Sequence, residues 1–426
     1  MTKDIISGLA IAGGMAAIAA GRVPGLRMNR ASIAFSTAAF LVATGAISPG
    51  DAIAAVDTGT IALLLSMMII VGGIRSSGLF DLVAARLSGL AGRPLAFLAA
   101  IITASGLLSA LFLNDTVCLA LGPVVAEACL RARRDPVPYL VATATAANVG
   151  SAATIIGNPQ NILIGARSGL SFADFTLRLG PPALLGLVAC WTVVVLAFPK
   201  DFLRRASGVG LPSPPASDAA PDSRAACVGP LAAVRIDVPL AAKSLIASVA
   251  MLVGFVSGVN VIAAALVPAA FLLASARAGS DRQFAGVDFN LLVLFAGLFV
   301  ITDAASRTAA FAWLERTVLS GAEASPWAFS AATAAVSNVI SNVPAVMALS
   351  PIVMRMGDPR NAWLVLAMAS TFAGNLTLLG SVANLIVAEG AATRGVRLGF
   401  WPYLKAGLPI TVITLAIGAA WLSPAP

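Results

Sequence analysis

Histidine is absent from this chain of 426 residues, and charged residues make up only 11% of it. Without histidine the chain lacks the usual metal ligand and proton shuttle, so Ser-His and Cys-His catalytic arrangements are excluded. Any proton chemistry must therefore use carboxylates. The sequence also has no HExxH and no GxxxxGK[ST] motif, so we expect neither an enzyme nor an ATP-driven pump, and no cofactor.

Cysteine is also scarce. The four cysteines, Cys118, Cys129, Cys190 and Cys227, contain no CxxC pair, and at least three of them fall in or beside apolar segments. Neither a disulfide framework nor a zinc site is indicated by this spacing. Free buried thiols are the expectation.

Apolar residues dominate what is present. They make up 59% of the chain, and the mean hydropathy is +0.93, whereas soluble domains are about 45–50% apolar. The net charge of +8 comes from short basic clusters between apolar runs, which indicate topology rather than nucleic-acid binding. We therefore predict an all-α polytopic protein of the lipid bilayer, with no nucleic-acid partner, whose first apolar stretch is a retained helix.

A polar stretch divides the apolar spans into two halves. Residues 200–243 are rich in Pro, Ser, Ala and Asp, a composition that cannot bury a core and that predicts a linker. The halves, 1–199 and 244–426, share motifs in the same order. Asn114 and Asn342 are each followed nine residues later by proline, and TIIGNPQNILI matches TLLGSVANLIV. We interpret the chain as a duplicated unit.

The basic residues orient these halves. Each half is predicted to contain scaffold spans, a re-entrant hairpin (95–130 and 325–354), a broken helix (138–166 and 362–388) and a last span. On this path 20 lysines and arginines lie inside and seven outside, as the positive-inside rule requires. The first half then starts outside and ends inside, the second does the reverse, and the linker is cytoplasmic. The sequence thus predicts two inverted repeats.

Polar residues interrupt the apolar spans at matching positions of both halves. Such groups must face protein, water or a ligand, because burial in lipid without a partner is costly. Glycine and proline at the same places break the helices, and the freed helix N-termini attract anions while free carbonyls bind cations. Hydrogen bonding between helices and close packing at glycine are the alternative explanations. The candidate substrate- or ion-binding residues are Asn114, Asp115, Thr116, Asn148, Thr154, Asn158, Gln160, Asn161, Asn338, Ser341, Asn342, Asn375, Thr377, Ser381 and Asn384.

Asp115 is the acid placed at a hairpin tip, and the second tip has Val343 at the equivalent position. A buried carboxylate that takes up a proton is a proton carrier, and an ionised one is a cation ligand. The alternative is a carboxylate that caps a half-helix.

Four segments resemble the paired hairpin and unwound-helix motifs of the ion transporter superfamily: LNDTVCLALGPVV, NVGSAATIIGNPQNILIG, SNVISNVPAVMALSP and AGNLTLLGSVANLIV. That superfamily contains arsenite permeases, citrate-type and divalent anion:sodium symporters, and sodium/proton antiporters, and this chain is most similar to the arsenite-permease and bacterial anion-permease branch. The resemblance implies a scaffold domain, an elevator-like transport domain and often a homodimer. The dicarboxylate symporters carry Ser-Asn-Thr at each tip, whereas these tips read Leu-Asn-Asp and Ser-Asn-Val. The difference favours another anion, metalloid or coupling ion.

We therefore expect a secondary transporter of the inner (plasma) membrane that works by alternating access. Its substrate would be an inorganic oxyanion or metalloid, such as arsenite, or a small carboxylate, and a proton or sodium gradient would drive it. The sequence does not identify a bound metal ion; a sodium ion, if it is the coupling ion, would bind near Asn114 and Asn342. The alternatives are a sodium/proton antiporter and, in another class, a channel or a non-transporting membrane scaffold.

Overall fold

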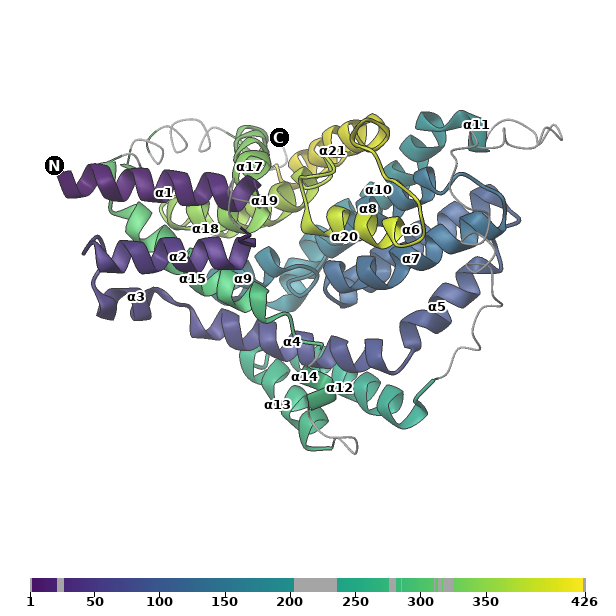
Figure 1. The fold of residues 1–426 in the computed structure, drawn as a ribbon, viewed down its shortest axis with the longest axis horizontal. Coiled ribbons are helices and arrows are strands. Elements are labelled where there is room, and N and C mark those ends of the chain that lie inside the picture. Colours follow the sequence, from purple (N-terminus) through teal and green to yellow (C-terminus); the bar gives the residue numbers. More distant parts are fainter. Residues whose placement is uncertain are drawn as a thin grey trace.

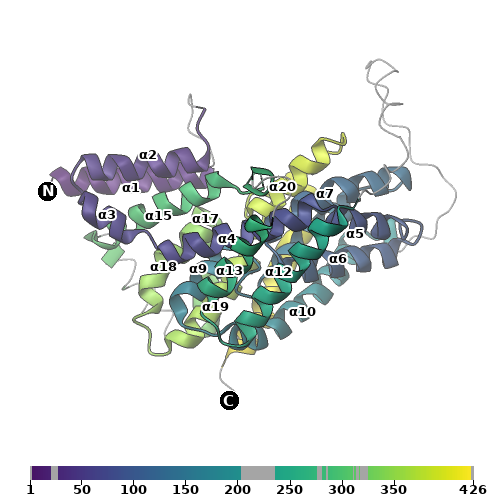
Figure 2. The same ribbon diagram turned by 90° about the horizontal axis from the view of Figure 1, so that it is seen from below.

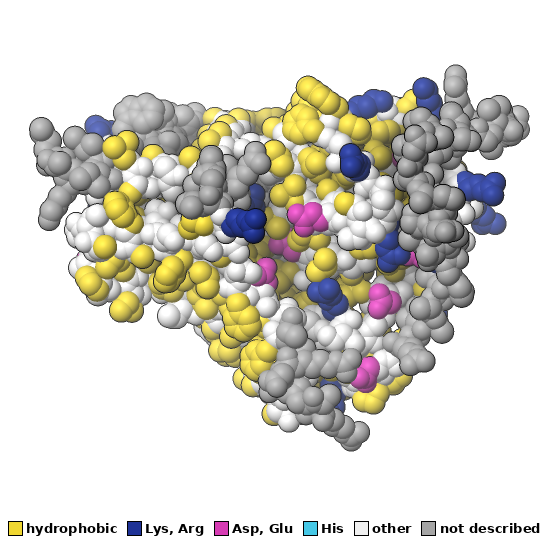
Figure 3. Space-filling model, viewed as in Figure 1, with side chains coloured by type: hydrophobic (Ala, Val, Ile, Leu, Met, Phe, Trp, Pro, Cys, Tyr) yellow, Lys and Arg dark blue, Asp and Glu magenta, His cyan; other side chains and the backbone are white. Residues whose placement is uncertain are grey.

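The computed structural model describes residues 2–20, 27–202, 236–275, 281–284, 286–309, 311–312, 316 and 325–423. Throughout these ranges the regular elements are helices and no strand is found (Figure 1), which confirms the all-α prediction. Six described helices are long and apolar enough to cross a bilayer: α4 (Thr58–Ser76), α6 (Pro94–Leu111), α10 (Phe172–Ala197), α12 (Val238–Val256), α15 (Phe289–Ser306) and α21 (Phe400–Leu422). Hydrophobic side chains are spread over the face shown in Figure 3, and charged ones are few.

Two groups of three helices form what we call the scaffold. One group is α1 (Thr2–Ala20), α2 (Arg30–Ala43) and α15, and the other is α4, α12 and α13 (Val261–Ala274). The first group lies side by side at one end of the molecule (Figures 1 and 2). A Cβ atom on Gly297 would lie 2.8 Å from the backbone carbon of Ala34, so α15 and α2 pack backbone against backbone.

Each half contains a helical hairpin. The hairpins are α6 with α7 (Asn114–Arg131), and α17 (Pro326–Ile340) with α18 (Asn342–Val353). The first helix of each hairpin begins with proline, whose missing N–H would have no partner at that position. The chain reverses through Phe112 and Leu113 at the first tip and through Ser341 at the second. Ser341 has a φ of 76°, a left-handed conformation that is uncommon outside glycine.

Each half also contains a broken helix. The four pieces are α8 (Val137–Ser151) and α9 (Pro159–Ser168), then α19 (Pro359–Ala373) and α20 (Val382–Ala392). The connecting segments fold back on the helix that precedes them. A Cβ on Gly157 would lie 2.2 Å from the Ser151 oxygen, and one on Gly380 would lie 2.9 Å from the Gly374 oxygen. Only glycine fits at these two points.

The hairpins pack on the broken helices. Within each half α6 contacts α8 and α17 contacts α19, while across the halves α7 contacts α20 and α18 contacts α9. The first of these contacts depends on small residues, because a Cβ on Gly150 would lie 2.2 Å from the Gly106 oxygen.

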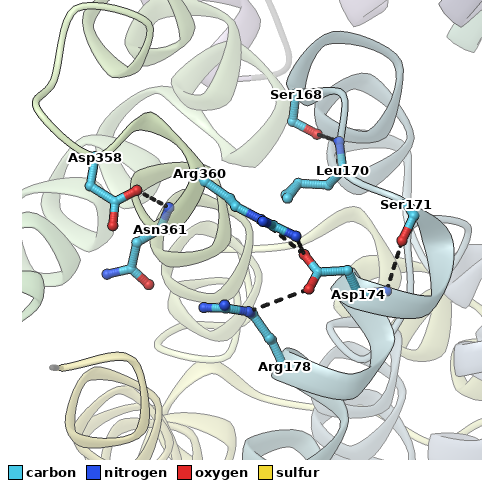
Figure 4. Close-up of polar contacts among 8 residues, drawn as sticks. All are labelled: Ser168, Leu170, Ser171, Asp174, Arg178, Asp358, Arg360 and Asn361. Carbon is cyan, nitrogen blue, oxygen red and sulfur yellow. Dashed lines mark hydrogen bonds and ion pairs between the residues drawn. The ribbon is translucent and has the colours of Figure 1, made fainter. Parts of the chain in front are cut away.

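The long helices α10 and α21 pack together beside the broken helices. At the start of α10, Asp174 is held between two arginines that point toward it from α10 and α19 (Figure 4). Its carboxylate lies 2.9 Å from Nη2 of Arg360 and 3.5 Å from Nε of Arg178. The Arg360–Asp174 ion pair thus links the two halves at this end of the bundle.

The described helices differ from the expected spans at a few places. Short helices α3 (Pro49–Ala55), α5 (Leu79–Ser88), α11 (Pro199–Phe202) and α14 (Asp281–Phe284) add to the expected spans. The linker was expected to reach residue 243, but α12 begins at Val238 because the Asp237 side chain accepts a hydrogen bond from the Leu240 amide. Residues 203–235, with Cys227, lie outside the described ranges. Cys118, Cys129 and Cys190 are free and buried, as expected.

Candidate functional site

Four helix N-termini meet at one small cavity. The cavity has a volume of about 50 Å³ and takes its lining from the first residues of α7, α9, α18 and α20. The lining side chains are Ile18, Arg30, Asn114, Asp115, Pro159, Gln160, Leu291, Leu294, Ser341, Asn342, Val343, Pro344, Ser381 and Val382. Because the first amides of a helix have no partner within it, each N-terminus presents positive partial charge. The convergence makes this cavity suited to a negatively charged or oxygen-rich ligand.

Local sequence explains why the helices begin here. The Asn158 side chain accepts a hydrogen bond from the Asn161 amide at 2.9 Å, and Pro159 occupies the first position of α9. At the first hairpin tip the backbone N–H of Asn114 donates to the backbone oxygen of Gly157 at 2.9 Å, which fixes α7 to the unwound segment. At the second tip the Ser337 hydroxyl donates to Oδ1 of Asn342 at 2.7 Å.

Asn148 is the hub behind the cavity. Its Nδ2 donates to Oδ1 of Asn375 at 2.9 Å and to Oδ1 of Asn384 at 3.0 Å. Its Oδ1 accepts from Nδ2 of Asn114 at 3.0 Å and from Oγ of Ser381 at 3.2 Å. All four hydrogen-bonding positions of one buried amide are therefore filled, and they join a hairpin tip to both broken helices.

The two halves cross-link in a reciprocal way. Ser381, which precedes α20, donates to Asn148 of α8, and Asn158, which precedes α9, donates to the Thr371 hydroxyl of α19 at 3.2 Å. Gln160 also donates to Thr371, at 3.3 Å. Thr371 lies six residues before Thr377, the same spacing as Asn148 before Thr154. The same contact is thus made twice with different side chains.

Asn161 and Asn384 hold the unwound segments in the same manner. Nδ2 of Asn161 donates to the oxygens of Ser151 at 3.2 Å and Thr154 at 3.0 Å. Nδ2 of Asn384 donates to the oxygens 10 and seven residues earlier, at 2.8 and 3.1 Å. Oδ1 of Asn161 is buried and accepts no hydrogen bond from the described residues, so it is an oxygen that a cation could use.

The predicted site residues separate into three groups. Those that line the cavity are Asn114, Asp115, Gln160, Ser341, Asn342 and Ser381. Those that support it through hydrogen bonds are Asn148, Asn158, Asn161, Asn375 and Asn384, with Thr154, whose hydroxyl donates to the Ala110 oxygen at 2.6 Å.

Three predicted residues are not placed at the cavity. Thr116 and Thr377 are not among the residues that line the cavity. Asn338 also lies outside the lining, and its side-chain amide donates to the backbone oxygens of Ala334 at 2.9 Å and Ala373 at 3.2 Å. For Asn338 the first contact lies within α17 and the second joins α17 to α19, so hydrogen bonding between helices, the alternative explanation, describes the second contact.

The sequence reasoning missed the scaffold side of the cavity. Ile18, Arg30, Leu291 and Leu294 all line it. The sequence held one indication that Arg30 could be a functional residue, because it is a basic residue at the very start of an apolar span. Among the described residues no group of three acidic or cysteine side chains suits a metal ion, so a sodium site would combine carbonyl and amide oxygens with a single carboxylate such as that of Asp115.

Comparison with known proteins agrees with this architecture. The profile of the citrate transporter family matches residues 15–261 and 253–424. A 46 kDa membrane protein of Mycobacterium leprae is 32% identical over 93% of this chain and 94% of its own length. A silicon efflux transporter of rice, Oryza sativa subsp. japonica, is 30% identical over 93% of each chain.

A solved structure shares the fold. The YdaH transporter of Alcanivorax borkumensis superposes with a TM-score of 0.56 at 14% identity, covering 99% of this chain and 97% of that one. Together with the apolar helices, these findings confirm the family that the hairpin and unwound-helix motifs resemble. The chain belongs to the citrate transporter family and is an integral membrane transporter.

Proposed function

We propose that this protein is a gradient-driven carrier of a small inorganic oxyacid or oxyanion, a class that includes arsenite and silicic acid. The observation that carries the proposal is the convergence of four helix N-termini and neutral amide and hydroxyl side chains on one cavity. Such a lining can donate several hydrogen bonds to a compact oxygen-rich solute without binding it irreversibly.

The size of the cavity favours a small solute. A water molecule needs roughly 10–15 Å³ of such space, so about 50 Å³ holds on the order of four non-hydrogen atoms. A trihydroxy or tetrahydroxy acid fits this volume, whereas citrate is several times larger. The name of the rice relative, a silicon efflux transporter, supports the same class. A small carboxylate is the second choice.

Asp115 supports coupling to a cation. It lines the cavity on the first turn of α7, beside Asn114. A carboxylate at this point repels an anion unless a proton or sodium ion neutralises it, so cation and substrate would bind together. The same residue favours a sodium/proton antiporter as the alternative function.

The mechanism that fits is alternating access by two inverted repeats. The elements of the first half, α1, α2, α4 and α6 to α10, have counterparts in the same order in α12, α13, α15 and α17 to α21. The hairpins and broken helices would move as a transport domain past the scaffold in the inner membrane, and a homodimer would steady the scaffold. The linker would be cytoplasmic.

A flux assay tests this function. Proteoliposomes containing the full chain are supplied in turn with arsenite, silicic acid, phosphate, sulfate, citrate and sodium, with an imposed proton or sodium gradient. We expect saturable, gradient-dependent flux of a small oxyacid and none of citrate. Flux that does not saturate would identify a channel, and flux of sodium against protons alone would identify the antiporter.

A further inference from the structure

The scaffold wall of the cavity comes from one end of three helices. Ile18 lies near the end of α1, Arg30 is the first residue of α2, and Leu291 and Leu294 lie in the first two turns of α15. On the proposed topology these ends all face the cytoplasm, because the basic loop between α1 and α2 lies inside. The cavity in this structure is therefore near the cytoplasmic side of the scaffold.

Arg30 and Asp115 face this cavity from different domains. Arg30 belongs to scaffold helix α2, and Asp115 belongs to the proposed moving hairpin. Both side chains are half-buried, and their charges attract each other. Among the described residues, the exposed Asp288 that caps α15 also acts on Asp115 and repels its carboxylate, so Asp115 needs a counter-charge, and α9, α18 and α20 add only neutral side chains to the cavity.

We propose that Arg30 is the positioning residue that releases the coupling cation, because its guanidinium takes the cation's place as the counter-charge of Asp115 when the site is near the cytoplasm. This inference rests on the proposed function. As the hairpin moves outward, Asp115 leaves Arg30 behind on α2 and must bind a cation to remain neutral in a low-dielectric site. On the way back Arg30 competes with the bound cation, which favours its release inside.

Charge removal tests this role. The full chain carrying Arg30→Gln is compared in proteoliposomes with the wild type, with Arg30→Lys, and with Arg86→Gln, which removes an exposed arginine of α5. Arsenite flux is measured over a pH series and a sodium series, both as net gradient-driven transport and as exchange with equal cation on both sides.

For Arg30→Gln we expect the apparent affinity for the coupling cation to rise about 10-fold, which corresponds to about 1.4 kcal/mol. Net transport should fall by about the same factor because release is slow. Exchange should persist, since it needs no cation release, and Arg30→Lys and Arg86→Gln should resemble the wild type. In an Asp115→Asn background, Arg30→Gln should change the cation affinity no further.

Two results with a folded Arg30→Gln protein would overturn the inference. One is an Arg30→Gln protein whose cation affinity and net transport match those of Arg86→Gln. The other is loss of exchange together with net transport in a monodisperse Arg30→Gln protein, which would make Arg30 a substrate ligand. If Arg30→Gln does not fold, a shifted cation affinity in Arg30→Lys contradicts the proposal. A wild-type protein that transports nothing would instead reject the proposed function.

Discussion

Asn148 of the first half and Asn384 of the second half are hydrogen-bonded to each other, with Nδ2 of Asn148 lying 3.0 Å from Oδ1 of Asn384. This bond is one of four made by the Asn148 amide, and it joins α8 directly to α20. The site is therefore built from both halves at once.

Asn148→Ala should destabilise the protein strongly. It leaves Asn114, Asn375, Asn384 and Ser381 each without one buried partner, and a lost hydrogen bond between membrane helices costs about 0.6 kcal/mol on average. We expect a total loss of about 2 kcal/mol, seen as a lower midpoint of thermal unfolding in detergent. Thr371→Val is the matched control, because it removes two longer bonds at the equivalent position. Equal unfolding midpoints for the two variants would contradict the hub role.

Gly150→Ala should separate α6 from α8. Its new Cβ would lie 2.2 Å from the Gly106 oxygen, a clash with backbone that no side-chain rotation relieves. Overpacking of this kind costs about 1–3 kcal/mol. Gly13→Ala in α1, where nothing lies within 4 Å, should leave stability unchanged or slightly higher. The comparison is made by thermal unfolding of both variants, and a stable Gly150→Ala protein would show that the contact is looser than described.

Asp115→Asn should uncouple transport from the cation gradient. The neutral amide resembles the protonated acid, so exchange of substrate should survive while gradient-driven uptake is lost. Both activities are measured in the same vesicles. Unchanged gradient-driven uptake would exclude Asp115 as the coupling site, whereas loss of both activities would assign it to substrate binding or helix capping.

The orientation can be tested by labelling. Asn260, the exposed N-cap of α13, is expected outside, and Ser217 in the linker is expected in the cytoplasm. In a protein whose four native cysteines are replaced, a membrane-impermeant thiol reagent should modify Asn260→Cys from the periplasmic side and spare Ser217→Cys. The reverse pattern would invert the proposed topology.

Local sequence was sufficient to predict the hairpins and broken helices. Glycine at 157 and 380 and proline at 159 stand among small polar residues, and this combination favours a break in the helix, because the polar groups cannot face lipid without a partner. The predicted boundaries therefore lie close to those of α6 to α9 and α17 to α20. Comparison of the halves could also have identified Thr371, since it aligns with Asn148.

The composition of the cavity wall was not predictable in the same way. Arg30 lies 85 positions from Asp115 in the sequence, and only the fold, in which α2 packs on α15 and α15 packs on α18, brings the two to one cavity. Asn338 shows the opposite problem. A polar residue within an apolar helix suggests a ligand-binding residue, but the side-chain amide of Asn338 donates to the backbone oxygens of Ala334 and Ala373 instead. The second of these bonds depends on the position of α19, which the sequence does not show.

Counterflow of a small oxyacid by Asn114→Ala and Asn342→Ala proteins tests the central claim most directly. Both amides line the cavity, and one lost hydrogen bond between membrane helices costs only about 0.6 kcal/mol on average, so folding should survive. We predict a loss of flux of about 10-fold or more in each variant, because a hydrogen bond to the solute is lost at the cavity. Ser350→Ala, which removes a buried hydroxyl bonded within α18 itself, should retain wild-type flux. Wild-type counterflow in both asparagine variants would show that the cavity is a packing feature and not the transport site.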